Sequence, residues 1–215
     1  MEHIIFDEHI AEKIKMRVLN GEKLGLDFIV CQTPDCILGG GNRTVWKDIE
    51  FFRDDWERRS RIIGSMISDE STSVIDCGCG MGKLKAYVGN RMYIGVDYCN
   101  RESVENIVIH DFNCGTFPDI YADTIVIAGV LEYIREHNKF MINVFKHAMR
   151  EVIISYCVRE LWMDIDSRRN LGHQNFYDTK TLVNFFECNG YILRDSTFYT
   201  DNHPIFKFVK EGTLR

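Results

Sequence analysis

From Ser73 onward, short apolar runs alternate with helical patterns, and this alternation limits the possible folds more than any other feature of the chain. The spacing predicts strands over 73–77, 92–96, 107–109, 124–127, 152–156, 191–193 and 205–209. Helices are expected over 83–88 and around 140–148 and 182–186. Most of the strands lack a polar face, as is typical of strands buried on both sides. The sequence therefore predicts an α/β fold with a doubly wound, seven-stranded and mostly parallel sheet.

The length of 215 residues suits a single domain. Residues 1–45 are expected to form a helical extension packed on the core, and residues 46–215 the main domain, with a long helix over 46–67. No apolar run approaches the roughly 20 residues that cross a bilayer. The N-terminus is acidic and has no basic segment of the kind that begins a secretory signal. We therefore expect a cytoplasmic protein without a membrane span.

Charge and cysteine usage exclude several classes of function. The formal net charge is −6, which argues against nucleic acid as a partner because phosphate contacts need a basic face. The eight cysteines include no pair with C-x-x-C spacing. Without a secretory signal, reduced thiols are the expected state, and no metal site is predicted.

A glycine-rich loop, Asp76-Cys77-Gly78-Cys79-Gly80-Met81-Gly82, follows the first expected strand. Alternate glycines let the backbone turn sharply and let a ligand lie against it. The dinucleotide-binding pattern G-x-G-x-x-G is excluded, because its last position is Lys83 or Lys85. A phosphate-binding P-loop is excluded as well, because no Gly-Lys-Ser/Thr closes the run. What remains is an acidic residue at a strand end followed by G-x-G-x-G.

This pattern resembles motif I of the class I S-adenosylmethionine-dependent methyltransferases, and later segments extend the resemblance. Tyr93-Ile94-Gly95-Val96-Asp97 resembles the second strand with its acidic end, and His110-Asp111-Phe112-Asn113 the segment after the third strand. The stretch 128–134, AGVLEYI, resembles the fourth-strand region of small-molecule methyltransferases, including bacterial ones associated with surface polysaccharides. The resemblance implies a class I methyltransferase fold and S-adenosylmethionine as cofactor.

The resemblance also implies roles for individual residues. Asp97 would accept hydrogen bonds from the ribose hydroxyls, and Asp111 would bind the adenine amino group beside the backbone N–H of Phe112. Asp76 would approach the methionine amino group. The residues expected to bind the cofactor are Asp76, Gly78, Cys79, Gly80, Gly82, Asp97, Tyr98, Asp111, Phe112, Ala128 and Gly129.

Simpler interpretations stay open at several of these positions. Asp76 can cap the glycine loop, and Asp111 can form an Asx-turn. The short segments 98–106 and 112–122 have room only for one-turn helices or loops. Other residues have a structural alternative beside a functional one: Phe112, Tyr133 and Trp56 as core, Glu132 as a helix cap, and Arg58 and Arg59 as surface charges.

The stretch 159–177 is long for a connection, and it concentrates polar and aromatic residues. It is either a hydrophilic surface loop or a lid over the methyl acceptor. Within it His173 is the candidate catalytic residue, as a general base or an acceptor-orienting group, because imidazole titrates near physiological pH. The alternative is a surface histidine bonded to a loop carbonyl.

The acceptor class follows from two absences in the sequence. No N/D-P-P-Y/F run follows the fourth strand, and Cys157 lacks the Pro-Cys or Thr-Cys context of a cytosine-methylating nucleophile. The sequence therefore predicts methyl transfer to a hydroxyl, or less readily an amine, of a small metabolite or glycan. The alternatives are an RNA methyltransferase and a non-catalytic partner subunit that keeps the fold.

Overall fold

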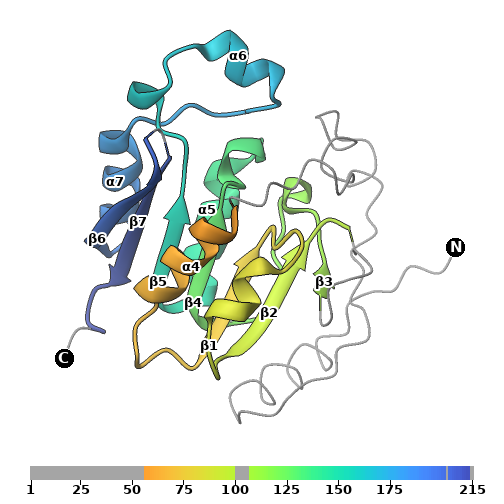
Figure 1. Ribbon diagram of the computed structural model, residues 1–215, viewed down its shortest axis with the longest axis vertical. Coiled ribbons are helices and arrows are strands. Elements are labelled where there is room, and N and C mark those ends of the chain that lie inside the picture. Colours follow the sequence, from red (N-terminus) through yellow and green to blue (C-terminus); the bar gives the residue numbers. More distant parts are fainter. Residues whose placement is uncertain (1–55, 100–106, 202, 214–215) are drawn as a thin grey trace, which may run out of the picture.

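A computed structural model of the chain describes residues 56–99, 107–201 and 203–213. Its sheet has seven strands in the order β3-β2-β1-β4-β5-β7-β6 (Figure 1). The strands are β1 (Ser73–Cys77), β2 (Met92–Asp97), β3 (Ile107–Ile109), β4 (Ala122–Ala128), β5 (Ala148–Ser155), β6 (Tyr191–Thr200) and β7 (His203–Lys210). The first five pair in parallel, and β7 is antiparallel to both β5 and β6. This arrangement confirms the predicted doubly wound, mostly parallel sheet. The expected extension over 1–45 lies outside the described residues.

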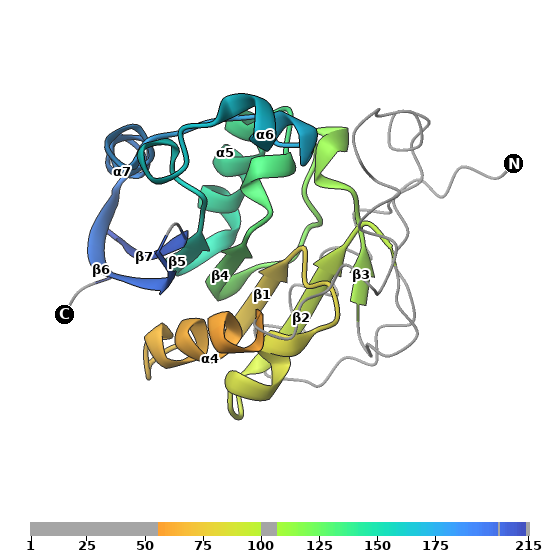
Figure 2. The ribbon, with the colours of Figure 1, turned by 45° about the horizontal axis from the view of Figure 1, so that its top comes forward.

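Helices cover both faces of the sheet. The α-helices are α4 (Trp56–Met66), α5 (His137–His147), α6 (Ile165–Asn170) and α7 (Thr179–Glu187). Short 3₁₀ helices are η2 (Lys83–Tyr87), η3 (Phe112–Cys114), η4 (Leu131–Tyr133) and η5 (Arg159–Leu161). Figure 2 shows α4 on one side of the sheet and α5 with α7 on the other. No helix in the described part of the chain is long and apolar enough to cross a membrane.

The core has two layers because strand side chains alternate between the faces of the sheet. On one face Ile75, Ile127 and Ile154 pack with residues of α5 and α7 such as Phe140 and Phe186. On the other face Val74, Val126 and Ile153 pack with Ile63 and Met66 of α4. By the same alternation, Asp76, Ala128 and Ser155 face the α4 side at the strand ends. The polar residues nearest the carboxyl ends are thus brought to one side of the sheet.

Two expected elements differ most from the observed ones. The helix expected over 83–88 is the 3₁₀ helix η2, preceded by Gly82 in a left-handed conformation with φ of 66°. Five residues are too few for the aligned dipole of a regular helix, so little anion-binding power is expected there. The strand expected over 191–193 extends to Thr200. Its middle is polar and exposed, and pairing with β7 extends it beyond the part with an apolar pattern.

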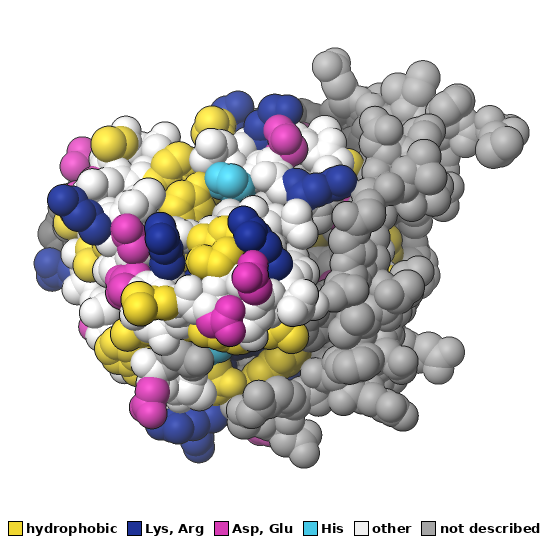
Figure 3. Space-filling view, turned by 90° about the horizontal axis from the view of Figure 1, so that it is seen from above, with side chains coloured by type: hydrophobic (Ala, Val, Ile, Leu, Met, Phe, Trp, Pro, Cys, Tyr) yellow, Lys and Arg dark blue, Asp and Glu magenta, His cyan; other side chains and the backbone are white. Residues whose placement is uncertain are grey.

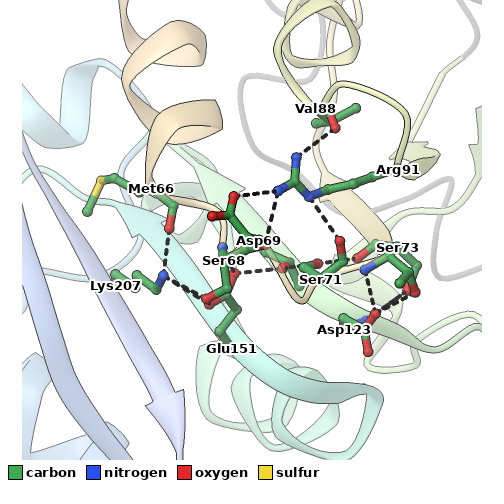
Figure 4. A network of polar contacts seen from close by, with 12 residues as sticks. Met66, Ser68, Asp69, Ser71, Ser73, Val88, Arg91, Asp123, Glu151 and Lys207 are labelled. Atoms are coloured by element: carbon green, nitrogen blue, oxygen red, sulfur yellow. Dashed lines mark hydrogen bonds and ion pairs between the residues drawn. The ribbon is translucent and has the colours of Figure 1, made fainter. Parts of the chain in front are cut away.

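A polar network secures the sheet close to the amino end of β4 (Figure 4). The buried carboxylate of Glu151 on β5 accepts hydrogen bonds from the backbone N–H of Ser68 at 3.0 Å and from Thr124 Oγ1 at 2.8 Å. Lys207 Nζ on β7 lies 3.2 Å from Glu151 Oε2. Because buried charges are costly unless paired and hydrogen-bonded, this network ties α4, β4, β5 and β7 together.

Candidate functional site

The expected ligand-binding residues lie at the carboxyl ends of β1, β2, β3 and β4. In the parallel register Cys77 is paired with Val96 and with Ile127, and Asp97 is paired with Ile109. The segments that follow these strands therefore meet at one edge of the sheet, where ligands of doubly wound folds bind. The structure brings together the residues that the sequence singled out after the first four strands.

The glycine loop turns sharply after β1. Gly78, Gly80 and Gly82 all have positive φ angles, of 69°, 56° and 66°. At Gly78 a Cβ atom would lie 2.3 Å from Cγ2 of Val130 in the segment after β4, so any other residue would force Val130 to shift. The side chain of Cys79 turns inward instead, and its sulfur fills the space where a Cβ on Gly95 would lie. The loop thus has the bare backbone of a cradle that a ligand can approach closely.

Asp97 holds this loop in place. Its Oδ2 accepts a hydrogen bond from the backbone N–H of Gly80 at 2.8 Å, and the residue is buried. Backbone bonds from Gly78 and Cys79 to the carbonyl of Val96, at 2.7 and 3.1 Å, attach the loop to β2 as well. The end of β2 and the glycine loop therefore form one rigid unit. A ribose-binding role for Asp97 stays a prediction.

Asp76 accepts a hydrogen bond from a side chain of β2, and the backbone N–H of Gly80 in the loop donates to Asp97 instead of Asp76. The hydroxyl of Tyr93 donates to Asp76 Oδ2 at 2.8 Å. Burial raises the pKa of Asp76 to about 6, while the bond from Tyr93 and the charge of Arg59 act in the opposite direction. The interpretation of Asp76 as a loop cap thus receives no support, and its approach to a methionine amino group stays a prediction.

Arg59 is a component of the site that the sequence did not reveal. Its guanidinium lies 5.1 Å from the ring of Trp56 and 5.6 Å from the ring of Tyr199. Its Nη1 lies 2.7 Å from where a Cβ on Gly129 would stand, so the side chain reaches across the end of β4. Burial lowers the pKa of Arg59, while Tyr199, Glu132 and other acidic groups act in the opposite direction. Arg59 Nε is buried without a hydrogen-bond partner among the described residues.

Asp111 and Phe112 follow β3 as expected. Asp111 forms the Asx-turn and the Phe112 ring takes the core position that the sequence left open for them. Asp111 Oδ1 accepts a hydrogen bond from the backbone N–H of Asn113 at 2.9 Å and so caps η3, as an Asx-turn does. The ring of Phe112 is buried in the core, 5.3 Å from Phe117 and 4.8 Å from Phe140. The adenine-binding roles of the Asp111 carboxylate and the Phe112 backbone are not tested. The one-turn helix η3 agrees with the short connection between β3 and β4.

The segment 157–177 is firmly attached to the domain. Asn175 is buried, donates to the carbonyls of Leu131 and Ile134 at 2.7 and 3.2 Å, and accepts from the hydroxyl of Tyr156 at 2.7 Å. The backbone N–H of Gln174 donates to the carbonyl of Glu132 at 2.6 Å. These bonds tie the segment to η4, directly after β4. The interpretation of the stretch as a simple surface loop does not account for this.

Glu132 lies under that segment. It is buried, and its Oε1 accepts from the backbone N–H of Cys157 at 2.8 Å. Its Oε2 and the Oγ of Ser155, at the end of β5, are buried without a hydrogen-bond partner among the described residues. Burial raises the pKa of Glu132, and the bond from Cys157 together with Arg59 and Arg168 opposes this. The positive charges of Arg59 and Arg168 thus reduce the cost of burying this carboxylate.

His173 is buried and bonded to an arginine. Its Nδ1 accepts from Nε of Arg168 at 3.2 Å, and its ring lies 5.2 Å from Tyr133 and 6.0 Å from Trp162. Burial, then the charges of Arg168 and His203, lower its pKa to about 4. The alternative of a surface histidine bonded to a loop carbonyl does not describe this environment. The catalytic role of His173 stays a prediction.

The described cysteines and acidic groups give no sign of metal or disulfide chemistry. Within the described ranges, no disulfide is formed by Cys77, Cys79, Cys99, Cys114, Cys157 or Cys188. The same ranges contain no group of three or more His, Cys, Asp or Glu side chains that could hold a metal ion.

The strand order, the antiparallel β7 and the glycine loop after β1 together define the fold of the class I S-adenosylmethionine-dependent methyltransferases. No family model matches the chain, and no curated protein matches it.

Solved structures show the same fold at low sequence identity. Magnesium protoporphyrin IX methyltransferase (ChlM) from Synechocystis PCC 6803, with bound S-adenosylhomocysteine, is 14% identical with a TM-score of 0.57, covering 79% of this chain and 92% of that one. N-methyltransferase NodS from Bradyrhizobium japonicum WM9, also bound to S-adenosylhomocysteine, is 13% identical with a TM-score of 0.54. The match covers 73% of this chain and 86% of that one. A third match is a chain from the complex between the Haloferax volcanii Trm112 methyltransferase activator and a putative methyltransferase. It has a TM-score of 0.60 at 11% identity, and the match covers 81% of this chain and 97% of that one.

Proposed function

We propose that the protein transfers a methyl group from S-adenosylmethionine to a small-molecule acceptor. The observation that carries this proposal is the glycine cradle after β1, attached to the acidic end of β2 by the bond between Gly80 and Asp97. A Cβ at position 78 would collide with Val130, so the loop lies close against the segment after β4. The class of fold and the sequence motifs lead to the same cofactor.

The residues present fit that cofactor chemically. Asp97 Oδ1 can accept from ribose hydroxyls while Oδ2 holds the loop, because a carboxylate offers several lone pairs. The methionine end carries both an amino group and a carboxylate. Asp76 is suited to the amino group, and the Arg59 guanidinium, which bonds no described carboxylate, is suited to the carboxylate.

The protein does not have to activate the methyl group itself. S-Adenosylmethionine supplies an already activated methyl group on a sulfonium. The protein has to hold the acceptor in line with that group and exclude water. The anchored segment 157–177 supports an acceptor site above the ends of β4 and β5, beside His173 and Tyr133. A hydroxyl acceptor, or less readily an amine, of a small metabolite or glycan is the class we propose.

Calorimetry with S-adenosylmethionine and S-adenosylhomocysteine tests the first part of this proposal. Binding of both is expected, and a non-catalytic partner subunit with a degenerate site would bind neither. The RNA alternative makes a different prediction, since RNA binding that falls steeply with salt is the mark of phosphate contacts. Incubation with radiolabelled S-adenosylmethionine and fractionated small metabolites, glycans and RNA then identifies the acceptor class by where the label appears.

A further inference from the structure

Arg168 is the only arginine of the described residues that is fully buried. Its guanidinium is fixed by three hydrogen bonds: Nε to His173 Nδ1 at 3.2 Å, Nη1 to the carbonyl of Trp162 at 3.3 Å and Nη2 to the carbonyl of Cys157 at 2.6 Å. The ring of Phe176 lies 5.1 Å from the guanidinium carbon. Since both carbonyls belong to the anchored segment, the Nε–H cannot easily turn away from His173.

This bond determines which nitrogen of His173 carries the proton. A guanidinium is a donor only and keeps its protons at any accessible pH, so the nitrogen it faces must be an acceptor. A neutral imidazole that accepts at Nδ1 carries its proton at Nε2. Protonation of Nδ1 would place two donors against each other, which agrees with the lowered pKa of His173.

The other groups around His173 do not change this assignment. The rings of Tyr133 of η4 and Trp162 of the anchored segment both pack edge to face against the His173 ring. His203 of β7 adds a second titratable group, which also lowers the pKa of His173. On η4 the nearest acid is Glu132, whose Oε1 is bonded to Cys157. Among the described residues no second hydrogen bond reaches the His173 ring, although 6% of the residue is exposed.

We propose that Arg168 is a positioning residue that holds His173 as a hydrogen-bond donor through Nε2, and that His173 receives an oxyanion of the methyl acceptor. This inference rests on the proposed methyl transfer and names its acceptor class: a planar hydroxyl compound that ionises without a base, such as a phenol or an enol. A sugar hydroxyl is a far weaker acid and would need a base, which His173 in this state does not provide. The rings of Tyr133 and Trp162 suit a planar acceptor, because aromatic groups stack on one another.

The balance of the step is simple. The acceptor loses its proton to solvent before it reacts. Its oxygen then forms the new O–C bond as the S–C bond of the sulfonium breaks, and the electron pair of that bond stays on sulfur. The His173 Nε2–H keeps its proton throughout and holds the bound oxyanion in position by a hydrogen bond until its charge is lost on methylation.

Nitrogen NMR of protein with ¹⁵N-labelled histidine tests the positioning role without any ligand. We expect the Nε2–H tautomer from pH 5 to pH 8 in the wild type, with the His173 signal assigned by its loss in His173→Gln. Arg168→Met should give a mixed tautomer and a His173 pKa raised by at least about one unit. The matched control is Arg169→Met, on the exposed side of the same helix, which should change neither. A wild-type His173 with its proton on Nδ1, or one titrating near pH 6.5, would overturn the proposal even if Arg168→Met does not fold.

Absorbance with 4-nitrophenol tests the acceptor class in protein saturated with S-adenosylhomocysteine. The coloured phenolate should bind at least about 10-fold more tightly than the neutral phenol, which lowers the apparent pKa of the bound probe by about one unit. His173→Phe should abolish this preference, and His173→Gln, which keeps a donor, should retain part of it. Preference for the neutral phenol, or no binding of either form, would overturn the acceptor class. Failure of S-adenosylhomocysteine to bind would count against the proposed function instead, and the NMR result would still decide the positioning role.

Discussion

The carboxylate of Asp97 accepts a hydrogen bond from the backbone N–H of Gly80 at 2.8 Å, so the residue expected to hold the ribose also holds the glycine loop. Asp97 is the last residue of β2, Gly80 lies in the loop after the neighbouring parallel strand β1, and the bond is buried. The shape of the loop and the ribose contact that we propose would therefore depend on one side chain.

Replacing Asp97 should weaken cofactor binding in a graded way. Asp97→Ala removes both functions and should lower affinity for S-adenosylhomocysteine by about 1–3 kcal/mol, or roughly 5- to 150-fold. Asp97→Asn should lose less, because its amide oxygen can still accept from Gly80. Calorimetry measures both, with Asp69→Ala as the control, since the Asp69 side chain is fully exposed. Equal affinity in the wild type and Asp97→Ala would exclude Asp97 from the site.

The collision at Gly78 predicts that Gly78→Ala lowers both stability and cofactor affinity. Its new Cβ would meet Val130 at 2.3 Å in a left-handed backbone conformation. Gly115→Ala is the matched control, because Gly115 has a φ of 79° but no atom within 4 Å of the added Cβ. Urea unfolding should show a loss about 1–3 kcal/mol larger for Gly78→Ala than for the control. Similar losses in both variants would mean that the contact with Val130 relaxes freely.

The sequence revealed the parts of the site that depend on local pattern. Strand ends and glycines are visible in short stretches of sequence, so the sequence alone places Asp76, Gly78, Gly80 and Asp97 at one edge of the sheet. The fold could be predicted from the sequence as well, because apolar strands that alternate with helices can pack together in only a few ways.

Residues that depend on contacts distant in sequence could not be placed in the same way. Arg59 has the pattern of a solvated helix position, and only the packing of α4 against Tyr199 of β6 brings its guanidinium to the site. The tautomer of His173 likewise depends on Arg168 becoming buried, which no periodicity indicates for an arginine. For Phe112 the motif position predicts a backbone contact to the adenine, which stays a prediction, and only the packing shows that its ring belongs to the core.

Arg59 should discriminate between ligands with and without an amino-acid tail. Arg59→Gln removes the charge that we assign to the methionine carboxylate, so affinity for S-adenosylhomocysteine should fall about 10- to 100-fold. Affinity for 5′-methylthioadenosine, which lacks that tail, should stay within about two-fold. The adjacent exposed residue supplies the control, Arg58→Gln, with no change for either ligand. Equal losses for both ligands would show that Arg59 supports the site only by packing.

Asp76 makes stability depend on pH in a direction that can be stated in advance. Burial raises its pKa in the folded protein to about 6, above the ordinary value of 3.8. The folded state therefore holds this proton more tightly than the unfolded state, and stability from Asp76 is fully present below about pH 4 and is lost as pH rises through about 6. At neutral pH the buried carboxylate is a net cost.

Asp76→Asn should remove that cost, because an amide carries no charge and its oxygen can still accept from Tyr93. Urea unfolding should find the variant more stable than the wild type by about 1–3 kcal/mol at pH 8 and equal to it near pH 4. Asp195→Asn, at an exposed position of β6, is the control for removing a negative charge. Its stability relative to the wild type should not depend on pH in this way. The variant should also bind S-adenosylhomocysteine more weakly if Asp76 contacts the amino group, because it no longer offers a carboxylate to a cation. A variant that differs from the wild type by the same amount at both pH values would contradict the raised pKa of Asp76, whereas unchanged binding would contradict only its role at the cofactor.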